Sequence, residues 1–179
     1  MPEGYDVREL STADAGAMTD AYRRNRRHLE PWEPYRPEIF YTRDGQVHGI
    51  EQQLAMVKAG LMVAWTIWHG DRLVGRINLN HIVQGVLRSA SLGYWVDHEH
   101  LGRGVAGGAV EHACAEARAR GLHRVDAGTM LANVASQRVL LKAGFEEYGL
   151  APKFLFIGGT WQDHRLFQRI LHDDPLPRV

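Results

Sequence analysis

The segment that most constrains the fold is a run of glycines between a strand-like stretch and a helix-like stretch. Residues 87–96 read as a strand, and apolar residues at helical spacing follow from about Gly104 to Arg120. Between them, the stretch from Gly102 to Gly108 holds four glycines. Glycine lets the backbone approach a ligand closely, and a helix N-terminus presents unpaired N–H groups. This pattern predicts a cradle for a phosphate or pyrophosphate, although a plain turn with packing glycines explains it almost as well.

The glycines match neither of the two common nucleotide-binding signatures. No Lys-Ser or Lys-Thr pair follows them, as a P-loop requires. A dinucleotide fingerprint needs a parallel strand before the glycines and an acidic residue about 20 positions later. The strand here comes late in an antiparallel arrangement, and Asp126 matches the acidic position only loosely. The glycines therefore predict an anion site of another kind.

The other elements describe one continuous α/β unit, so we expect a single domain over residues 1–179. Antiparallel hairpins come first, then a β–α–β crossover, then another hairpin. Thr12 is the expected N-cap of the first helix, and Leu29 to Tyr41 is expected to be a proline-punctuated loop or short helix. We expect strands at 5–10, 61–68, 72–81, 87–96, 122–128, 145–157 and 160–171, and helices at 14–27, 44–59, 104–120 and 133–143.

The composition is that of an ordinary globular protein and excludes several classes. Lys plus Arg and Asp plus Glu both number 21, so the net charge is zero and no nucleic-acid partner is expected. No apolar stretch approaches about 18 residues, so no membrane span is expected. Cys114 is the only cysteine, which excludes an intrachain disulfide and fits a reducing cytoplasm. Met1 to Glu9 lacks the pattern of a signal peptide, so we expect a cytoplasmic protein.

Four segments resemble the GCN5-related N-acetyltransferases (GNAT), and within them the RimJ/RimL type, which acetylates ribosomal-protein N-termini. They occur in the family's order and span almost the whole chain. The segments are 25–34 (NRRHLEPWEP), 92–97 with 101–106 (LGYWVD and LGRGVA), 133–136 with 142–145 (NVAS and KAGF), and 154–164 (FLFIGGTWQDH).

The resemblance implies a fold and a donor site. The fold is a mixed, mostly antiparallel sheet with helices on both faces and a splayed parallel strand pair that holds the cofactor. Many relatives have Gln or Arg where this chain has Leu101, but the donors in this loop are backbone groups. The implied contacts to acetyl-CoA, or another acyl-CoA, are the pyrophosphate loop Gly102, Arg103, Gly104, Val105, Ala106 and Gly107, the pantetheine-pairing Trp95 and Val96, and Asn133.

The implied reaction is attack of an amine on a thioester. A backbone N–H near Val96 could bind the oxyanion, and Ser136 matches a serine that protonates the leaving thiolate. Ser136 could equally be a capping or helix-surface serine. Relatives often carry a glutamate base where this chain has Tyr148, which is a usable proton donor but a poor base at neutral pH. Glu147 is adjacent and should point the other way on a strand.

The acceptor is expected to contact the aromatic and acidic residues of the segment 24–41. Trp32, Tyr35 and Tyr41 could wall a groove for a peptide N-terminus, and Glu30 or Glu33 could attract its ammonium. Burial within a packed lid explains Trp32 at least as well.

These features lead to three functional hypotheses. The first is transfer of acetyl from acetyl-CoA to a primary amine in a ternary complex, most simply to a protein N-terminal α-amine, whose pKa of about 7.7–8.0 leaves a useful neutral fraction. The second is a small amine acceptor (an amino acid, a polyamine or a drug), and the third is a non-catalytic acyl-CoA-binding module. No metal is expected, although His98 and His100 flank the loop, because this chemistry needs none. Self-association into a homo-oligomer stays open.

Overall fold

The computed structural model describes residues 1–175. The predicted elements are present within a few residues of their expected bounds, with three additional 3₁₀ turns. The strands are β1 (Tyr5–Glu9), β2 (Val63–His69), β3 (Arg72–Val83), β4 (Ser89–Val96), β5 (Arg124–Met130), β6 (Glu146–Ile157) and β7 (Thr160–Ile170); the helices are α1 (Ala15–Leu29), α2 (Arg43–Lys58), α3 (Val105–Ala119) and α4 (Val134–Lys142); the 3₁₀ turns are η1 (Thr12–Asp14), η2 (Glu38–Tyr41) and η3 (His98–His100).

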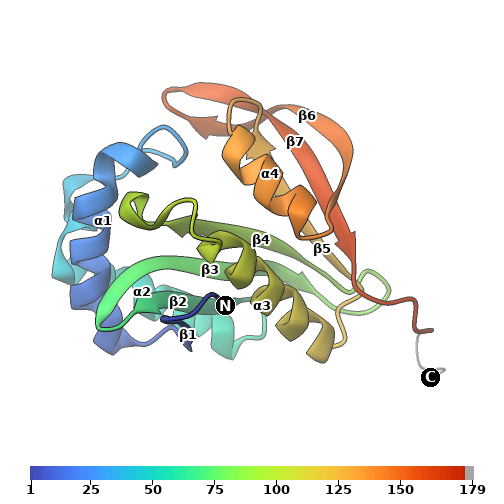
Figure 1. Ribbon diagram of the computed structural model, residues 1–179, viewed down its shortest axis with the longest axis horizontal. Helices are drawn as coiled ribbons and strands as arrows, with labels where there is room; N and C mark the ends of the chain where they lie inside the picture. Colours follow the sequence, from blue (N-terminus) through green and yellow to red (C-terminus); the bar gives the residue numbers. More distant parts are fainter. Residues whose placement is uncertain (176–179) are drawn as a thin grey trace.

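The strands form one seven-stranded sheet in the order β1-β2-β3-β4-β5-β7-β6 (Figure 1). Neighbouring strands are antiparallel at every pair except β4 and β5, which are parallel. Helix α3 forms the crossover that connects that pair, as parallel strands require. The predicted mixed, mostly antiparallel fold is confirmed.

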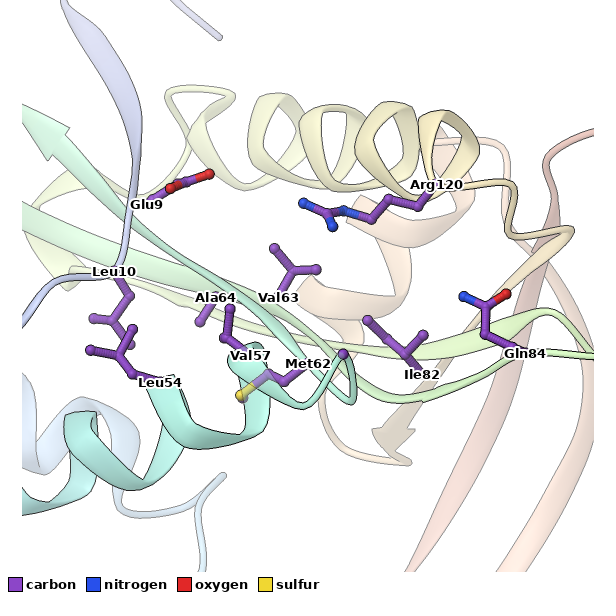
Figure 2. A pocket seen from close by; sticks show the side chains of 11 residues that line it. Glu9, Leu10, Leu54, Val57, Met62, Val63, Ala64, Ile82, Gln84 and Arg120 are labelled. Atoms are coloured by element: carbon purple, nitrogen blue, oxygen red, sulfur yellow. The ribbon is translucent and has the colours of Figure 1, made fainter.

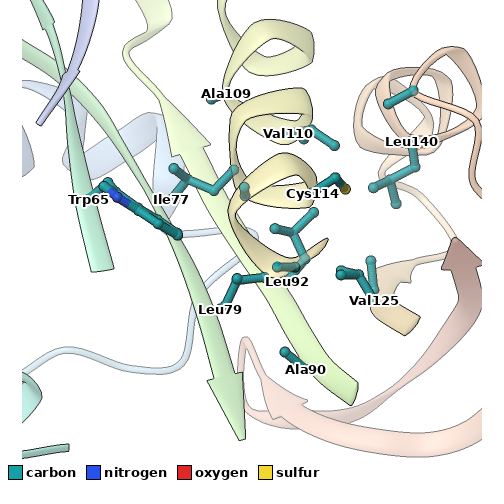
Figure 3. Close-up of a cluster of buried hydrophobic side chains, with 14 of the residues drawn as sticks. Trp65, Ile77, Leu79, Ala90, Leu92, Ala109, Val110, Cys114, Val125 and Leu140 are labelled. Carbon is teal, nitrogen blue, oxygen red and sulfur yellow. The ribbon is translucent and has the colours of Figure 1, made fainter. Parts of the chain in front are cut away.

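Each face of the sheet packs against two helices. Helices α3 and α4 cover one face, where Val110 and Leu140 are buried with Leu92 and Val125 of the sheet (Figure 3). Helices α1 and α2 cover the other face, around Trp95 of β4. Side chains alternate along a strand, so β4 sends Val96 to the α3 face and Trp95 to the α1 face. Cys114 lies in the α3 core as expected, and burial raises the pKa of its thiol to about 11.

The start of the first helical segment differs from the prediction. The N-cap is Ser11, not Thr12, and it caps the short turn η1 that leads into α1. The Ser11 hydroxyl accepts a hydrogen bond from the N–H of Ala13 at 3.2 Å, and Asp14 accepts one from the N–H of Ser11 at 2.9 Å. Ser11 is the N-cap because its third following residue is Asp14, whose carboxylate can accept a hydrogen bond from the Ser11 N–H. With Thr12 as N-cap, that position would be Ala15, which has no acceptor.

Strands β4 and β5 pair over three residues and then separate. The paired residues are Ser89–Ser91 with Arg124–Asp126. Beyond them β4 stays paired with β3 as far as Val96, while β5 stays paired with β7 as far as Met130. The two strands diverge because each follows its other neighbour, which leaves their facing edges without a partner strand.

None of the helices in residues 1–175 has the length and apolar character that a membrane span needs.

Candidate functional site

The glycine loop before α3 presents a row of unpaired backbone N–H groups. Gly102 and Gly104 have positive φ values of 72° and 79°, a conformation that other residues rarely adopt. The first hydrogen bond of α3 runs from the N–H of Gly108 to the carbonyl of Gly104 at 3.0 Å. Within the described chain, no N–H from Gly102 to Gly107 donates to a protein acceptor. These groups lie at an exposed helix N-terminus, where the helix dipole favours an anion.

The space around this loop is open at two of its glycines, while Met1 and Pro2 lie against Gly104 and Gly108. A Cβ placed on Gly102 or Gly107 would meet no atom within 4 Å, so both positions face open space. The side chain of Arg103 is exposed beside them. The loop therefore combines backbone donors, room and one positive charge.

The buried carboxylate of Asp97 fixes the chain between the end of β4 and this loop. Its side chain is completely inaccessible and caps η3 by accepting from the N–H of Glu99 at 3.0 Å. The Nε of Arg24 on α1 donates to it at 2.7 Å, and Arg72 of β3 lies 3.5 Å away. Burial acts to raise the pKa of Asp97, but the hydrogen bonds from Glu99 and Arg24 outweigh it and hold the pKa below its usual value. One carboxylate thus fixes three elements around the end of β4.

The register of β3 and β4 decides which backbone groups face the diverging strands. The N–H of Asp97 donates to the carbonyl of Val74 on β3 at 2.7 Å. Polar groups alternate between the two sides of a strand, so Trp95 also directs its N–H and carbonyl to β3, opposite Arg76. Tyr94 and Val96 direct theirs to the open edge. Of the two residues predicted to pair with the pantetheine arm, Val96 therefore directs its backbone groups to the open edge and Trp95 does not. Tyr94, which was not predicted, directs its groups there as well.

The side chain of Tyr94 contacts the predicted serine. Its hydroxyl lies 2.8 Å from the hydroxyl of Ser136, on the face covered by α4. Burial raises the pKa of Tyr94 to about 12, so the phenol is protonated at neutral pH. Asn133 accepts from the N–H of Ser136 at 3.1 Å and caps α4. Tyr94 was not among the predicted site residues, although alternation from Val96 placed it on the same face.

Tyr148 lies apart from this group. It occupies a bulge in β6, and the guanidinium of Arg124 lies 4.8 Å from the centre of its ring. Glu147 instead forms an ion pair with Arg165 at 2.9 Å. The two neighbours contact different partners because they project to opposite sides of the strand, as expected for Glu147. The two predicted catalytic residues, Ser136 and Tyr148, are not brought together.

A pocket of about 190 Å³ lies between the end of α1 and the tip of the β6–β7 hairpin. We name it the α1–hairpin pocket. Its carboxylates are Glu30 and Glu33; Glu33 is paired with Arg36 at 3.2 Å, whereas Glu30 has no ion-pair partner within residues 1–175. Four predicted acceptor residues (Glu30, Glu33, Tyr35 and Tyr41) line it and Trp32 does not. The lining residues are Tyr22, Arg26, Leu29, Glu30, Glu33, Pro34, Tyr35, Arg36, Tyr41, Gly158 and Gly159.

Tyr22 connects the α1–hairpin pocket to β4. Its hydroxyl accepts a hydrogen bond from Nε1 of Trp95 at 3.0 Å, and the two ring centres are 5.0 Å apart. Tyr41 forms another wall beneath the guanidinium of Arg26, and burial raises the pKa of its phenol. Tyr22 therefore joins the pocket to Trp95, which β4 carries on the face opposite Tyr94.

A second pocket, of about 260 Å³, lies at the free end of β2 (Figure 2). It is mostly apolar, with Glu9 and Arg120 at its rim, and it shares no residue with the predicted site. In the part of the chain that the structure describes, no three His, Cys, Asp or Glu side chains are grouped as a metal site needs.

Comparisons with known proteins agree with this geometry. A family model described as an acetyltransferase (GNAT) domain matches residues 6–146. The chain is 34% identical over 174 residues, 94% of each protein, to the probable N-acetyltransferase YjcK of Bacillus subtilis. The ribosomal-protein-S5-alanine acetyltransferase of Vibrio fischeri superposes with a TM-score of 0.91 at 32% identity, covering 97% of both chains.

A second solved structure, Mycobacterium smegmatis RimJ in complex with CoA-disulfide, is 29% identical with a TM-score of 0.89. The match covers 93% of this chain and 81% of that one. Since a family model and relatives of this similarity match most of the chain, the protein belongs to the GNAT family of acetyltransferases and, within it, to the RimJ/RimL type of N-acetyltransferase.

Proposed function

We propose that this protein transfers an acetyl group from acetyl-CoA to the N-terminal α-amine of a protein, by direct attack in a ternary complex. The observation that carries the proposal is the separation of β4 from β5 after Ser91 and Asp126, next to the glycine loop. A strand edge without a partner can pair with the amide groups of a pantetheine arm, while the helix N-terminus binds the pyrophosphate. The CoA-disulfide bound to the Mycobacterium smegmatis relative supports a CoA thioester as donor.

Residues on both sides of the separated strands would hold this donor. The N–H groups from Gly102 to Gly107 bind the pyrophosphate, and the backbone of Tyr94 and Val96 pairs with the pantetheine arm. Asn133 is suited to contact the arm, because its Nδ2 has no acceptor within the described residues. The bound thioester supplies the activated acetyl group, and the Val96 N–H stabilises the oxyanion that forms during attack.

The acceptor would bind in the α1–hairpin pocket. The unpaired Glu30 carboxylate is suited to an ammonium, and the exposed ring of Tyr35 gives a surface for residues that follow the N-terminus. An α-amine has a pKa of about 7.7–8.0, so roughly a tenth to a sixth of it is neutral at pH 7. Positioning supplies a large part of the rate. The Vibrio fischeri relative is named for alanine acetylation of ribosomal protein S5, which supports an N-terminal acceptor.

The leaving thiolate would be protonated from the α4 side. Ser136 and Tyr94 are hydrogen-bonded to one another, and both hydroxyls carry protons at neutral pH. A proton given up by Ser136 can be replaced through Tyr94. Tyr148 contacts Arg124 on the other face and is not needed for this step.

An acceptor screen tests the proposal. Thiol release from acetyl-CoA is followed with three acceptors: a peptide with a free N-terminal alanine, the same peptide with a blocked N-terminus and one lysine, and spermidine. The expected result is a kcat/KM at least tenfold higher for the free N-terminus. Faster turnover of spermidine would favour the small-amine alternative. CoA binding without turnover of any amine would favour the binding-module alternative.

A further inference from the structure

His164 is a buried histidine on β7 that has no role in the proposed transfer. Only 3% of its surface is exposed. The sheet register places it opposite Met130 of β5 on one side and Ala151 of β6 on the other. Met130 ends the part of β5 that has separated from β4, so His164 lies next to the separated part of β5, with β5 between it and the gap.

The imidazole lies on the α1 face of the sheet. A Cβ added to Gly128 would sit 3.7 Å from Cδ2 of His164 and 3.6 Å from Phe154. Gly128 faces away from α3, because its neighbours Ala127 and Thr129 are buried on the α3 face. The pairing of Ser91 with Asp126 puts Gly128 on the same face as Trp95. His164 therefore lies on the face that carries the α1–hairpin pocket, and glycine at 128 leaves room for its ring.

The hydrogen bonds of the ring define which nitrogen can accept a proton. Nδ1 lies 3.1 Å from the backbone carbonyl oxygen of Gln162. A carbonyl only accepts, so Nδ1 carries the hydrogen of the neutral ring and Nε2 keeps its lone pair. Nε2 has no hydrogen-bond partner among residues 1–175. The ring of Phe154 packs against the imidazole edge to face, with the ring centres 5.3 Å apart.

The charged groups on the surrounding strands are engaged elsewhere. Arg124 pairs with Asp126 on β5, Arg165 of β7 pairs with Glu147 of β6, and Asp163 accepts from the N–H of Lys153 at 2.8 Å. None of them is bonded to His164. The imidazole is therefore a base without a charged partner on this face, over the separated part of β5.

We propose that Nε2 of His164 is the general base that takes a proton from the acceptor amine, an assignment that rests on the proposed function. The ammonium gives one proton to Nε2, and the neutral nitrogen attacks the thioester carbonyl carbon. The C–N bond forms and the C–S bond breaks. The thiolate takes a proton from Ser136, and the second proton lost by nitrogen replaces it through solvent. The imidazolium then returns its proton to water.

The test is His164→Asn, whose amide can still donate to the Gln162 carbonyl but lacks a base at Nε2. The expected result is a kcat lower by about 100-fold, the lower end of the range for a lost general base, with the calorimetric Kd for CoA within twofold of wild type. The difference should narrow near about pH 9, where an α-amine is already neutral. In His164→Ala, added imidazole should restore part of kcat.

A matched control is His112→Asn. His112 also has a buried Nε2 without a partner, but it lies on α3 against Trp65, away from the gap. This variant should keep wild-type kcat. A His164→Asn kcat within threefold of wild type, or no imidazole rescue of His164→Ala, would overturn the assignment while the proposed function stands. A wild-type protein that binds CoA but acetylates no amine would overturn both.

Discussion

At the scale of single residues, Thr129 shows how a site beside a sheet leaves a polar group unsatisfied. Its hydroxyl is buried on β5 without a hydrogen-bond partner in the described chain, on the α3 face where β5 has left β4. A buried hydroxyl without a partner costs about 1 kcal/mol or more. Thr129→Val removes this cost at nearly constant shape. We expect its free energy of unfolding, measured in urea without ligand, to rise by about 1 kcal/mol.

Thr19→Val is the matched control for this prediction. Thr19 is equally buried, at 4% exposure, but its hydroxyl donates to the carbonyl of Ala15 at 2.7 Å. The same substitution should therefore lower stability there, because a made hydrogen bond is lost. If both variants lose stability, the Thr129 hydroxyl is satisfied in solution and the prediction is wrong.

At the scale of elements, the carboxylate of Asp97 joins α1, β3 and η3 ahead of the glycine loop. Its pKa is lower in the folded protein than in the unfolded chain, where it is about 3.9. The ionised group therefore stabilises the fold fully above that value, and this stabilisation is lost as the pH falls through the folded pKa. In Asp97→Asn, we expect lower stability at neutral pH and a smaller decline on acidification below about pH 4.

Urea unfolding at a series of pH values measures this effect. Asp71→Asn is the control, because Asp71 lies exposed in the turn between β2 and β3 and forms no ion pair within residues 1–175. Its stability should follow the wild-type pH dependence. An Asp97→Asn protein with the wild-type slope would show that the carboxylate is not held in its ionised form by Arg24 and Glu99.

At the scale of the whole molecule, the order and type of elements were predictable because each carries a local signal. Alternation marks the strands, and helical spacing marks the segment after Gly104. Thr12 was the expected N-cap on local grounds, but Ser11 caps the turn because the Asp14 carboxylate accepts from its N–H. The separation of β4 from β5 is not a local property, because it depends on the pairing of each strand with its other neighbour.

The candidate site was predictable where backbone groups make it and less so where side chains do. The glycines at positions 102 and 104 predict the loop directly from the sequence. The positions of Tyr94 and His164 depend on strand register, because a shift of one residue would move each side chain to the other face of the sheet. The sequence alone does not give that register. Trp95 was predicted to pair with the donor, and the register turns its backbone groups to β3 instead.

CoA titration calorimetry of two glycine variants tests most directly whether the glycine loop is the donor site. Gly104 and Gly121 have φ values of 79° and 74°, and alanine at either costs about 1 kcal/mol of backbone strain. Only Gly104 lies at the N-terminus of α3; Gly121 follows its C-terminus. We predict that Gly104→Ala weakens CoA binding at least tenfold, whereas Gly121→Ala binds CoA like the wild type. Equal affinities in the two variants would contradict the account.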